Sequence, residues 1–170
     1  MNKPLHQFFT QDHRRIDDLL ERATADPNQI DDHLYRQFRV GLLTHIKMEE
    51  NILFPAAKKA NGGKPLPNFD RFRLEHGALT TLMAVPPTPE MLRVLTHVLT
   101  RHDDAEEVRG GMYEVCEALT TAQTDQLLAQ LHQITPVPVH PPNPLPAVLK
   151  AAKRILKRAG YDYDEIVSES

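Results

Sequence analysis

Histidine and glutamate recur at helical spacing in this sequence. His45 is followed four residues later by Glu49, and His102 is followed four residues later by Glu106. Residues four apart project from nearly the same side of a helix, one turn apart, so each pair directs an imidazole and a carboxylate to one place. Imidazole and carboxylate without thiolate are typical ligands of iron, manganese, zinc or copper.

Two further histidines, His13 and His76, lie in the apolar stripes of other segments with helical period. A single histidine on an apolar face is usually a hydrogen-bonded core residue, and a single His-x-x-x-Glu pair usually lies on the surface. Six polar groups that converge from four helices, however, are costly in an apolar core unless they bind metal. Six ligands are too many for one tetrahedral zinc ion and fit two metal ions. The predicted metal ligands are His13, His45, Glu49, His76, His102 and Glu106.

Proline and glycine separate the segments that must position these ligands. We predict helices over residues 4–25, from Asp26-Pro27 to Asn61, from Asn68 to Met83, and from Pro89 through Glu106. Short connections between four amphipathic helices indicate antiparallel neighbours. The predicted fold class is therefore all-α, an up-down-up-down four-helix bundle with an additional short helix and a C-terminal helical tail.

Three regions follow from this pattern. Residues 1–134 form the predicted metal-binding bundle, with the short extra helix over residues 124–134. Residues 135–146 are a proline-rich linker, and residues 147–170 hold a basic amphipathic helix and an acidic C-terminal end. Gly110 and Gly111 predict a kink or bulge in the fourth helix, just beyond Glu106.

Composition excludes several classes of protein. Of the 170 residues, 41% are hydrophobic and 25% are charged, which is typical of a globular protein. The net charge of -3 gives no reason to expect a nucleic acid or a membrane as partner. A single cysteine, Cys116, cannot form an intrachain disulfide, and no secretory signal or membrane-spanning run is visible. We expect a cytoplasmic protein.

Four motifs carry a resemblance to a known family. They are His13 within Gln-Asp-His-Arg-Arg-Ile, His45-x-x-x-Glu49-Glu50 followed by Ile-Leu-Phe-Pro, His76 within Leu-Glu-His-Gly, and His102-x-x-x-Glu106-Glu107. Over about residues 4–134 the chain resembles the bacterial hemerythrin-like (HHE, cation-binding) domain. The resemblance implies a bundle around a non-haem di-iron centre with the six predicted ligands, in which the glutamates bridge the irons and zinc or manganese can substitute.

The family resemblance also implies the kind of function. It indicates a protein that binds oxygen, nitric oxide or peroxide, or senses iron or redox state, without catalytic residues or an organic cofactor. Thr80 stands where oxygen-carrying hemerythrins place a further histidine, which disfavours simple oxygen carriage. Two alternatives stay open: a di-iron enzyme that reduces peroxide or nitric oxide, and a metal-stabilised regulatory module whose C-terminal helix binds a protein partner or a second copy.

Three residues near the motifs have weaker signals. Asp12 and Glu75 each precede a predicted ligand histidine and cannot share its direction, so they are candidates for a supporting or capping role. Tyr113 lies seven residues after Glu106 and could reach the ligands only if the fourth helix stays in phase across Gly110-Gly111. We therefore predict that Tyr113 is a core residue.

Overall fold

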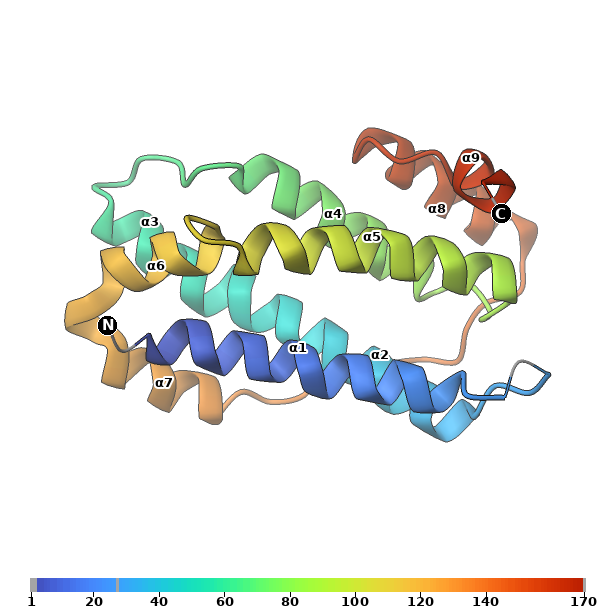
Figure 1. Ribbon diagram of the computed structural model, residues 1–170, viewed down its shortest axis with the longest axis horizontal. Helices are drawn as coiled ribbons and strands as arrows, with labels where there is room; N and C mark the ends of the chain where they lie inside the picture. Colours follow the sequence, from blue (N-terminus) through green and yellow to red (C-terminus); the bar gives the residue numbers. More distant parts are fainter. Residues whose placement is uncertain (1–2, 27, 170) are drawn as a thin grey trace. The chain divides into compact units, whose positions relative to one another are not determined.

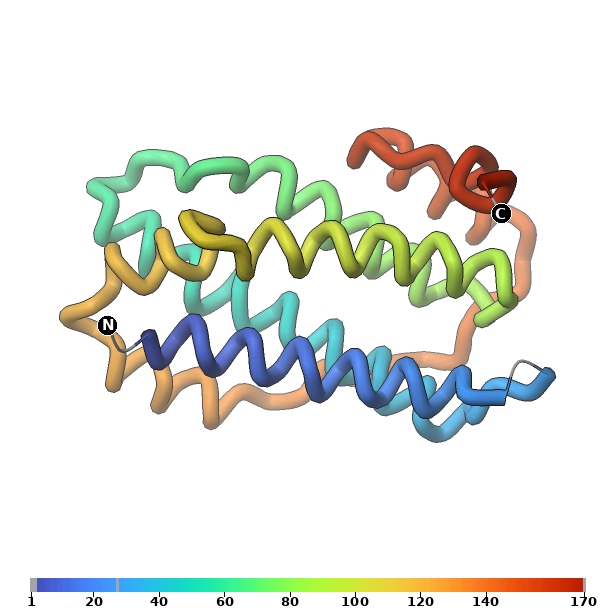
Figure 2. Tube along the Cα trace, in the orientation of Figure 1, coloured from blue at the N-terminus to red at the C-terminus, as the bar shows by residue number. Residues whose placement is uncertain are grey.

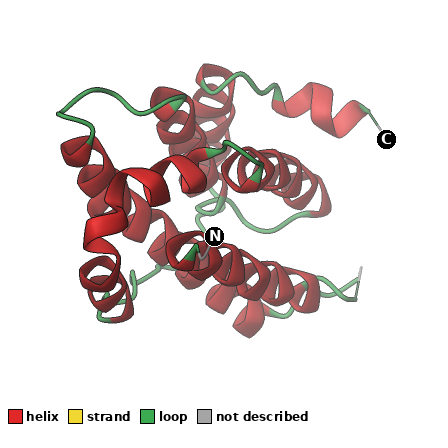
Figure 3. Cartoon of the chain, turned by 60° about the vertical axis from the view of Figure 1, so that its left-hand side comes forward, coloured by secondary structure: helices red, strands yellow, loops and turns green. Residues whose placement is uncertain are grey.

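A computed structural model describes residues 3–26 and 28–169 of the chain, and every regular element within these ranges is helical (Figure 3). The predicted all-α fold class is confirmed. Contacts divide the chain into two compact units, residues 1–67 with 105–139 and residues 68–104 with 140–170. No helix within the described ranges is long and apolar enough to cross a membrane.

The first unit is built around an antiparallel helix pair (Figure 1). Its elements are α1 (Pro4–Ala23), α2 (Asp32–Met48), a π-helical turn (Glu49–Leu53), α3 (Phe54–Ala60), α6 (Met112–Thr120), a 3₁₀ turn (Thr121–Gln123) and α7 (Thr124–His132). The backbone N–H of Asp31 donates to the carbonyl of Ala23 at 2.9 Å, which closes the connection between α1 and α2. Phe9, Phe38 and Phe54 are fully buried and form much of the core.

The start of α2 differs from the prediction. Asp26 accepts a hydrogen bond from the backbone N–H of Asn28 and forms a turn instead of capping a helix. Pro27 lies outside the described residues. The cap is Asp31, whose side chain accepts from the backbone N–H of Leu34 at 2.9 Å, so the helix begins at Asp32. The predicted end of the helix near Asn61 is confirmed, since α3 stops at Ala60.

The π-helical turn was not predicted. A π turn holds more residues than an α turn, so it rotates the following residues relative to a regular helix. The buried positions are accordingly Leu53, at the end of the turn, and then Phe54 and Ala57, whereas an uninterrupted α-helical period predicts Ile52 and Ala56. Glu49 opens the π turn and is fully buried.

The helix that carries Glu106 breaks completely instead of bending. α5 (Pro89–Glu107) ends one residue after Glu106, and the chain turns sharply before α6 (Figure 2). Gly110 has a φ of 79°, which other residues rarely adopt. A Cβ atom on Gly111 would lie 2.6–2.8 Å from three backbone oxygens. Both glycines are therefore required for the turn that starts α6.

The second unit contains α4 (Phe69–Leu82), α5 as far as Asp104, α8 (Pro146–Arg158) and α9 (Tyr163–Ser168). α8, the predicted basic amphipathic helix, packs against α4, with Ile155 close to Gly77. Residues 134–145 are irregular, as their prolines predict. The short helix α9 was not predicted; Asp162 caps it by accepting from the backbone N–H groups of Asp164 and Glu165.

Candidate metal centre

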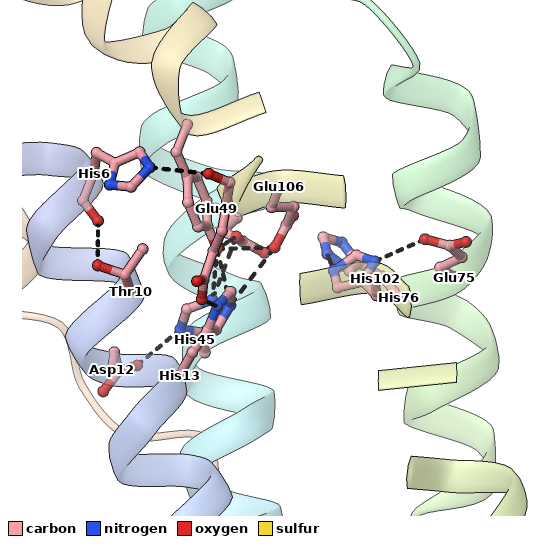
Figure 4. Close-up of polar contacts among 12 residues, drawn as sticks. His6, Thr10, Asp12, His13, His45, Glu49, Glu75, His76, His102 and Glu106 are labelled. Carbon is pink, nitrogen blue, oxygen red and sulfur yellow. Dashed lines mark hydrogen bonds and ion pairs between the residues drawn. The ribbon is translucent and has the colours of Figure 1, made fainter. Parts of the chain in front are cut away.

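Four of the six predicted ligands meet in the first unit. His13 comes from α1, His45 from the last turn of α2, Glu49 from the π-helical turn and Glu106 from the end of α5. Each offers one nitrogen or oxygen atom, and these four atoms lie within 4.8 Å of one another. All four residues are at most 2% exposed. Figure 4 shows how the side chains converge from separate helices.

Carboxylates outside this cluster orient its two histidines. His13 Nδ1 lies 2.7 Å from a Glu107 oxygen, and His45 Nδ1 lies 2.8 Å from an Asp12 oxygen. Burial opposes ionisation of both acids, but hydrogen bonds from the histidines and from nearby arginines hold both pKa values below the usual range. An ionised carboxylate only accepts hydrogen bonds, so each Nδ1 carries the hydrogen and Nε2 faces the cluster. Metal-binding histidines are usually held in this way.

The remaining two predicted ligands meet each other in the second unit. The Nε2 atoms of His76 and His102 are 3.1 Å apart, and both residues are 2% exposed. His102 Nδ1 lies 2.8 Å from Glu75, again a histidine oriented by a carboxylate (Figure 4). Glu75 is buried and also accepts from Arg71 Nε at 3.0 Å and from the Tyr161 hydroxyl at 2.7 Å. Burial alone would raise the pKa of Glu75, but these three hydrogen bonds lower it.

Asp12 and Glu75, the candidates for a supporting role, each form a hydrogen bond with a predicted ligand histidine, with a detail that the sequence does not reveal. Each acid contacts a histidine on a different helix from its own: Asp12 on α1 supports His45 on α2, and Glu75 on α4 supports His102 on α5. Glu107 does the same for His13 and was not predicted. The available signal was its position directly beside a predicted ligand, the position that Asp12 and Glu75 also occupy.

Sequence reasoning also missed Tyr113. It is a buried residue, as predicted, but its hydroxyl reaches the four ligands. The hydroxyl oxygen lies 2.6 Å from Glu49 Oε1, 2.9 Å from Glu106 Oε2, 3.0 Å from His13 Nε2 and 3.1 Å from His45 Nε2. It arrives from α6, a separate helix, so helical phase after Glu106 could not reveal it.

The electrostatics of this cluster favour a cation. Two buried carboxylates and two inward-facing imidazole nitrogens surround one hydroxyl, which has one hydrogen to donate. Burial would lower the pKa of His45, but Glu49 and Asp12 raise it to about 10. The cluster thus attracts positive charge strongly, either as a proton on an imidazole or as a metal ion. Its nitrogen and oxygen donors fit iron, manganese or zinc.

Two other residues that the sequence analysis considered, Thr80 and Cys116, are not part of the cluster. Thr80, one turn after His76, is exposed on α4. Cys116 is buried, and its burial raises the pKa of the thiol, so it is not a ready thiolate ligand. The donor set of the described cluster therefore contains no sulfur.

Comparison with known proteins shows the family to which the chain belongs. Residues 5–115 match the model of the hemerythrin HHE cation-binding domain. The match covers more than half of the chain and includes all six predicted ligands. No curated protein and no solved structure matches the chain. The family resemblance read from the motifs is thus confirmed: the chain belongs to the hemerythrin HHE cation-binding domain family.

Proposed function

We propose that the chain holds two iron ions and uses them to bind a small ligand, namely oxygen, nitric oxide or peroxide, or to sense iron or redox state. The proposed ligands are the six residues predicted from the sequence, in an up-down-up-down four-helix bundle: His13, His45, Glu49, His76, His102 and Glu106. The supporting observation is the group of four buried donor atoms within 4.8 Å in the first unit.

A second pair of imidazoles supports a second metal ion. His76 and His102 lie with their Nε2 atoms 3.1 Å apart, close to the separation of about 3 Å that neighbouring ligands on one metal ion adopt when metal–ligand bonds are about 2.1 Å. α5 carries His102 and Glu106 one turn apart, so a single helix supplies ligands to both groups. In the proposal, Glu49 and Glu106 would supply the carboxylate ligands of the irons.

Iron would supply the redox chemistry and the coordination positions at which a small molecule binds. The residues of the chain would hold it, balance its charge and limit access of water. Phe9 is fully buried, and its ring lies 5.4 Å from the ring of His45. Such an apolar wall beside the ligands favours a small uncharged molecule over bulk water.

Metal analysis with optical spectroscopy tests this proposal. The protein is loaded with iron without oxygen, and spectra are recorded before and after addition of nitric oxide. We expect iron in the wild type and its severe loss in the double variant His45→Ala/Glu49→Ala. His33→Ala is the matched control, because His33 lies exposed on the same helix.

Each outcome bears on the proposal. Unchanged iron content in the double variant would show that the ligands are wrong. Iron that gives no spectral response to any gas or to peroxide would favour the regulatory module. Sustained consumption of peroxide or nitric oxide by the reduced protein would favour the enzyme.

A further inference from the structure

The Tyr113 hydroxyl lies among the proposed ligands in the manner of a further ligand. Its oxygen is 2.6–3.1 Å from one atom of each of His13, His45, Glu49 and Glu106. Metal–ligand bonds of about 2.1 Å place neighbouring ligand atoms of an octahedral sphere about 3 Å apart. The four separations from the hydroxyl are therefore those expected between neighbours in one coordination sphere.

The other separations in the cluster agree with this geometry. His45 Nε2 lies 3.3 Å from Glu49 Oε1, and His13 Nε2 lies 3.6 Å from Glu106 Oε2. With the hydroxyl included, the first unit offers five nitrogen and oxygen atoms around one point. The hydroxyl has one hydrogen, so it can donate to only one of its four neighbours at a time, and a hydrogen bond to any other neighbour requires that neighbour to donate.

The position of the phenol ring is fixed by its surroundings. Tyr113 is 1% exposed, and its ring stacks on Phe9 with the centroids 5.1 Å apart and the planes 25° apart. The ring of His6 lies nearly perpendicular to the Tyr113 ring, with the centroids 6.1 Å apart. The turn at Gly110 and Gly111, where a Cβ on Gly111 would meet backbone oxygens, sets the start of α6 at Met112, one residue before Tyr113. The ring therefore has little room to swing the hydroxyl away from the cluster.

We propose that Tyr113 binds the metal ion of the first unit through its phenolate oxygen, as a seventh protein ligand. This inference rests on the proposed iron binding. On binding, the phenolic O–H bond breaks, its proton leaves to solvent, and the oxygen forms a bond to the metal without any change of oxidation state. A phenolate is a hard anionic ligand, so it favours the ferric over the ferrous ion and occupies a position otherwise open to a small molecule.

A phenolate bound to ferric iron has a visible charge-transfer band, which identifies this ligand directly. The experiment loads the full-length protein with iron, oxidises it in air, and measures iron content, the visible spectrum and the resonance Raman spectrum. Tyr113→Phe keeps the ring and removes the oxygen. The control is Tyr35→Phe, since Tyr35 is a buried tyrosine ten residues before His45 on α2.

We expect coloured wild-type protein whose phenolate vibrations shift when tyrosine is ring-deuterated. Tyr113→Phe is expected to lose the band, and Tyr35→Phe to keep it. Iron-loaded wild type without tyrosine-dependent vibrations would overturn the inference while leaving iron binding intact, whatever the iron content of Tyr113→Phe. Retention of the full band in Tyr113→Phe would overturn it as well, and a wild type that binds no iron would overturn both proposals.

Discussion

Asp12→Asn is expected to weaken metal binding although Asp12 is not itself a proposed ligand. Its carboxylate lies 2.8 Å from His45 Nδ1 and is 15% exposed, so the contact is largely shielded from water. Asparagine can still accept a hydrogen bond, but without the negative charge that makes the imidazole a better donor to metal. Loss of such a carboxylate typically lowers metal affinity tenfold to a hundredfold, which corresponds to about 1.4–2.8 kcal/mol.

The loss of metal affinity in Asp12→Asn must be separated from the loss of a second contact of the Asp12 side chain. Asp12 also pairs with Arg15 at 2.8 Å, but the Arg15 side chain is 53% exposed, so this pair contributes at most about 1 kcal/mol to folding. Asp18→Asn is the matched control. Asp18 lies on the same helix and pairs with the exposed Arg22, with no contact to histidine among its hydrogen bonds in the described chain.

Competition with a chelator of known affinity measures the effect. Asp12→Asn is expected to release iron at a tenfold to hundredfold lower chelator concentration than the wild type, and Asp18→Asn at the wild-type concentration. Urea unfolding of the metal-free variants checks that both remain folded. Equal affinity of Asp12→Asn and wild type would refute the reasoning that Asp12 acts on the metal through His45.

Other perturbations have equally direct readouts. Tyr161→Phe removes one of the three hydrogen bonds to Glu75. It is expected to weaken iron binding less than tenfold in the chelator competition. A larger loss would mean that the C-terminal residues hold the centre more directly. Gly111→Ala is expected to lower the free energy of unfolding, measured in urea, by on the order of 2 kcal/mol, because the added Cβ meets backbone oxygens. If this variant were as stable as the wild type, the tight turn would have to lie elsewhere in the chain. Burial raises the pKa of Tyr35 to about 12, above the pKa of about 10 that tyrosine has in the unfolded chain. The neutral Tyr35 side chain therefore contributes fully to the stability of the fold below about pH 10, and this contribution is lost as the pH rises toward 12. Tyr35→Phe is expected to reduce this alkaline loss in thermal unfolding, and an unchanged pH profile would contradict it.

The sequence predicts much of this structure because its strongest signals are periodic. The His-x-x-x-Glu pairs and the apolar stripes share one helical period, and proline and glycine mark where that period stops. The boundaries of α1 and α8 and the start of α5 therefore agree closely with expectation. The same regularity brings His13, His45, Glu49 and Glu106 together in the first unit.

The features that the sequence does not reveal are breaks in that period. The π-helical turn after His45 adds a residue and moves the buried face. The sequence Glu-Asn-Ile-Leu-Phe is compatible with an ordinary α-helix, so it gives no sign of this turn. The turn at Gly110-Gly111 interrupts the helical period of α5. The number of residues between Glu106 and Tyr113 therefore does not predict where the Tyr113 side chain points. The supporting acid Glu107 meets His13 from another helix, a contact that depends on packing between helices.

The central claim is that six nitrogen- and oxygen-bearing residues hold two iron ions in each chain. X-ray absorption at the iron edge, on protein whose iron and chain concentrations are both measured, tests it most directly. We predict about two irons per chain, nitrogen and oxygen as the only nearest neighbours, and scattering from a second iron close by. Full occupancy at one iron per chain, sulfur among the nearest neighbours, or the absence of iron–iron scattering would contradict the account.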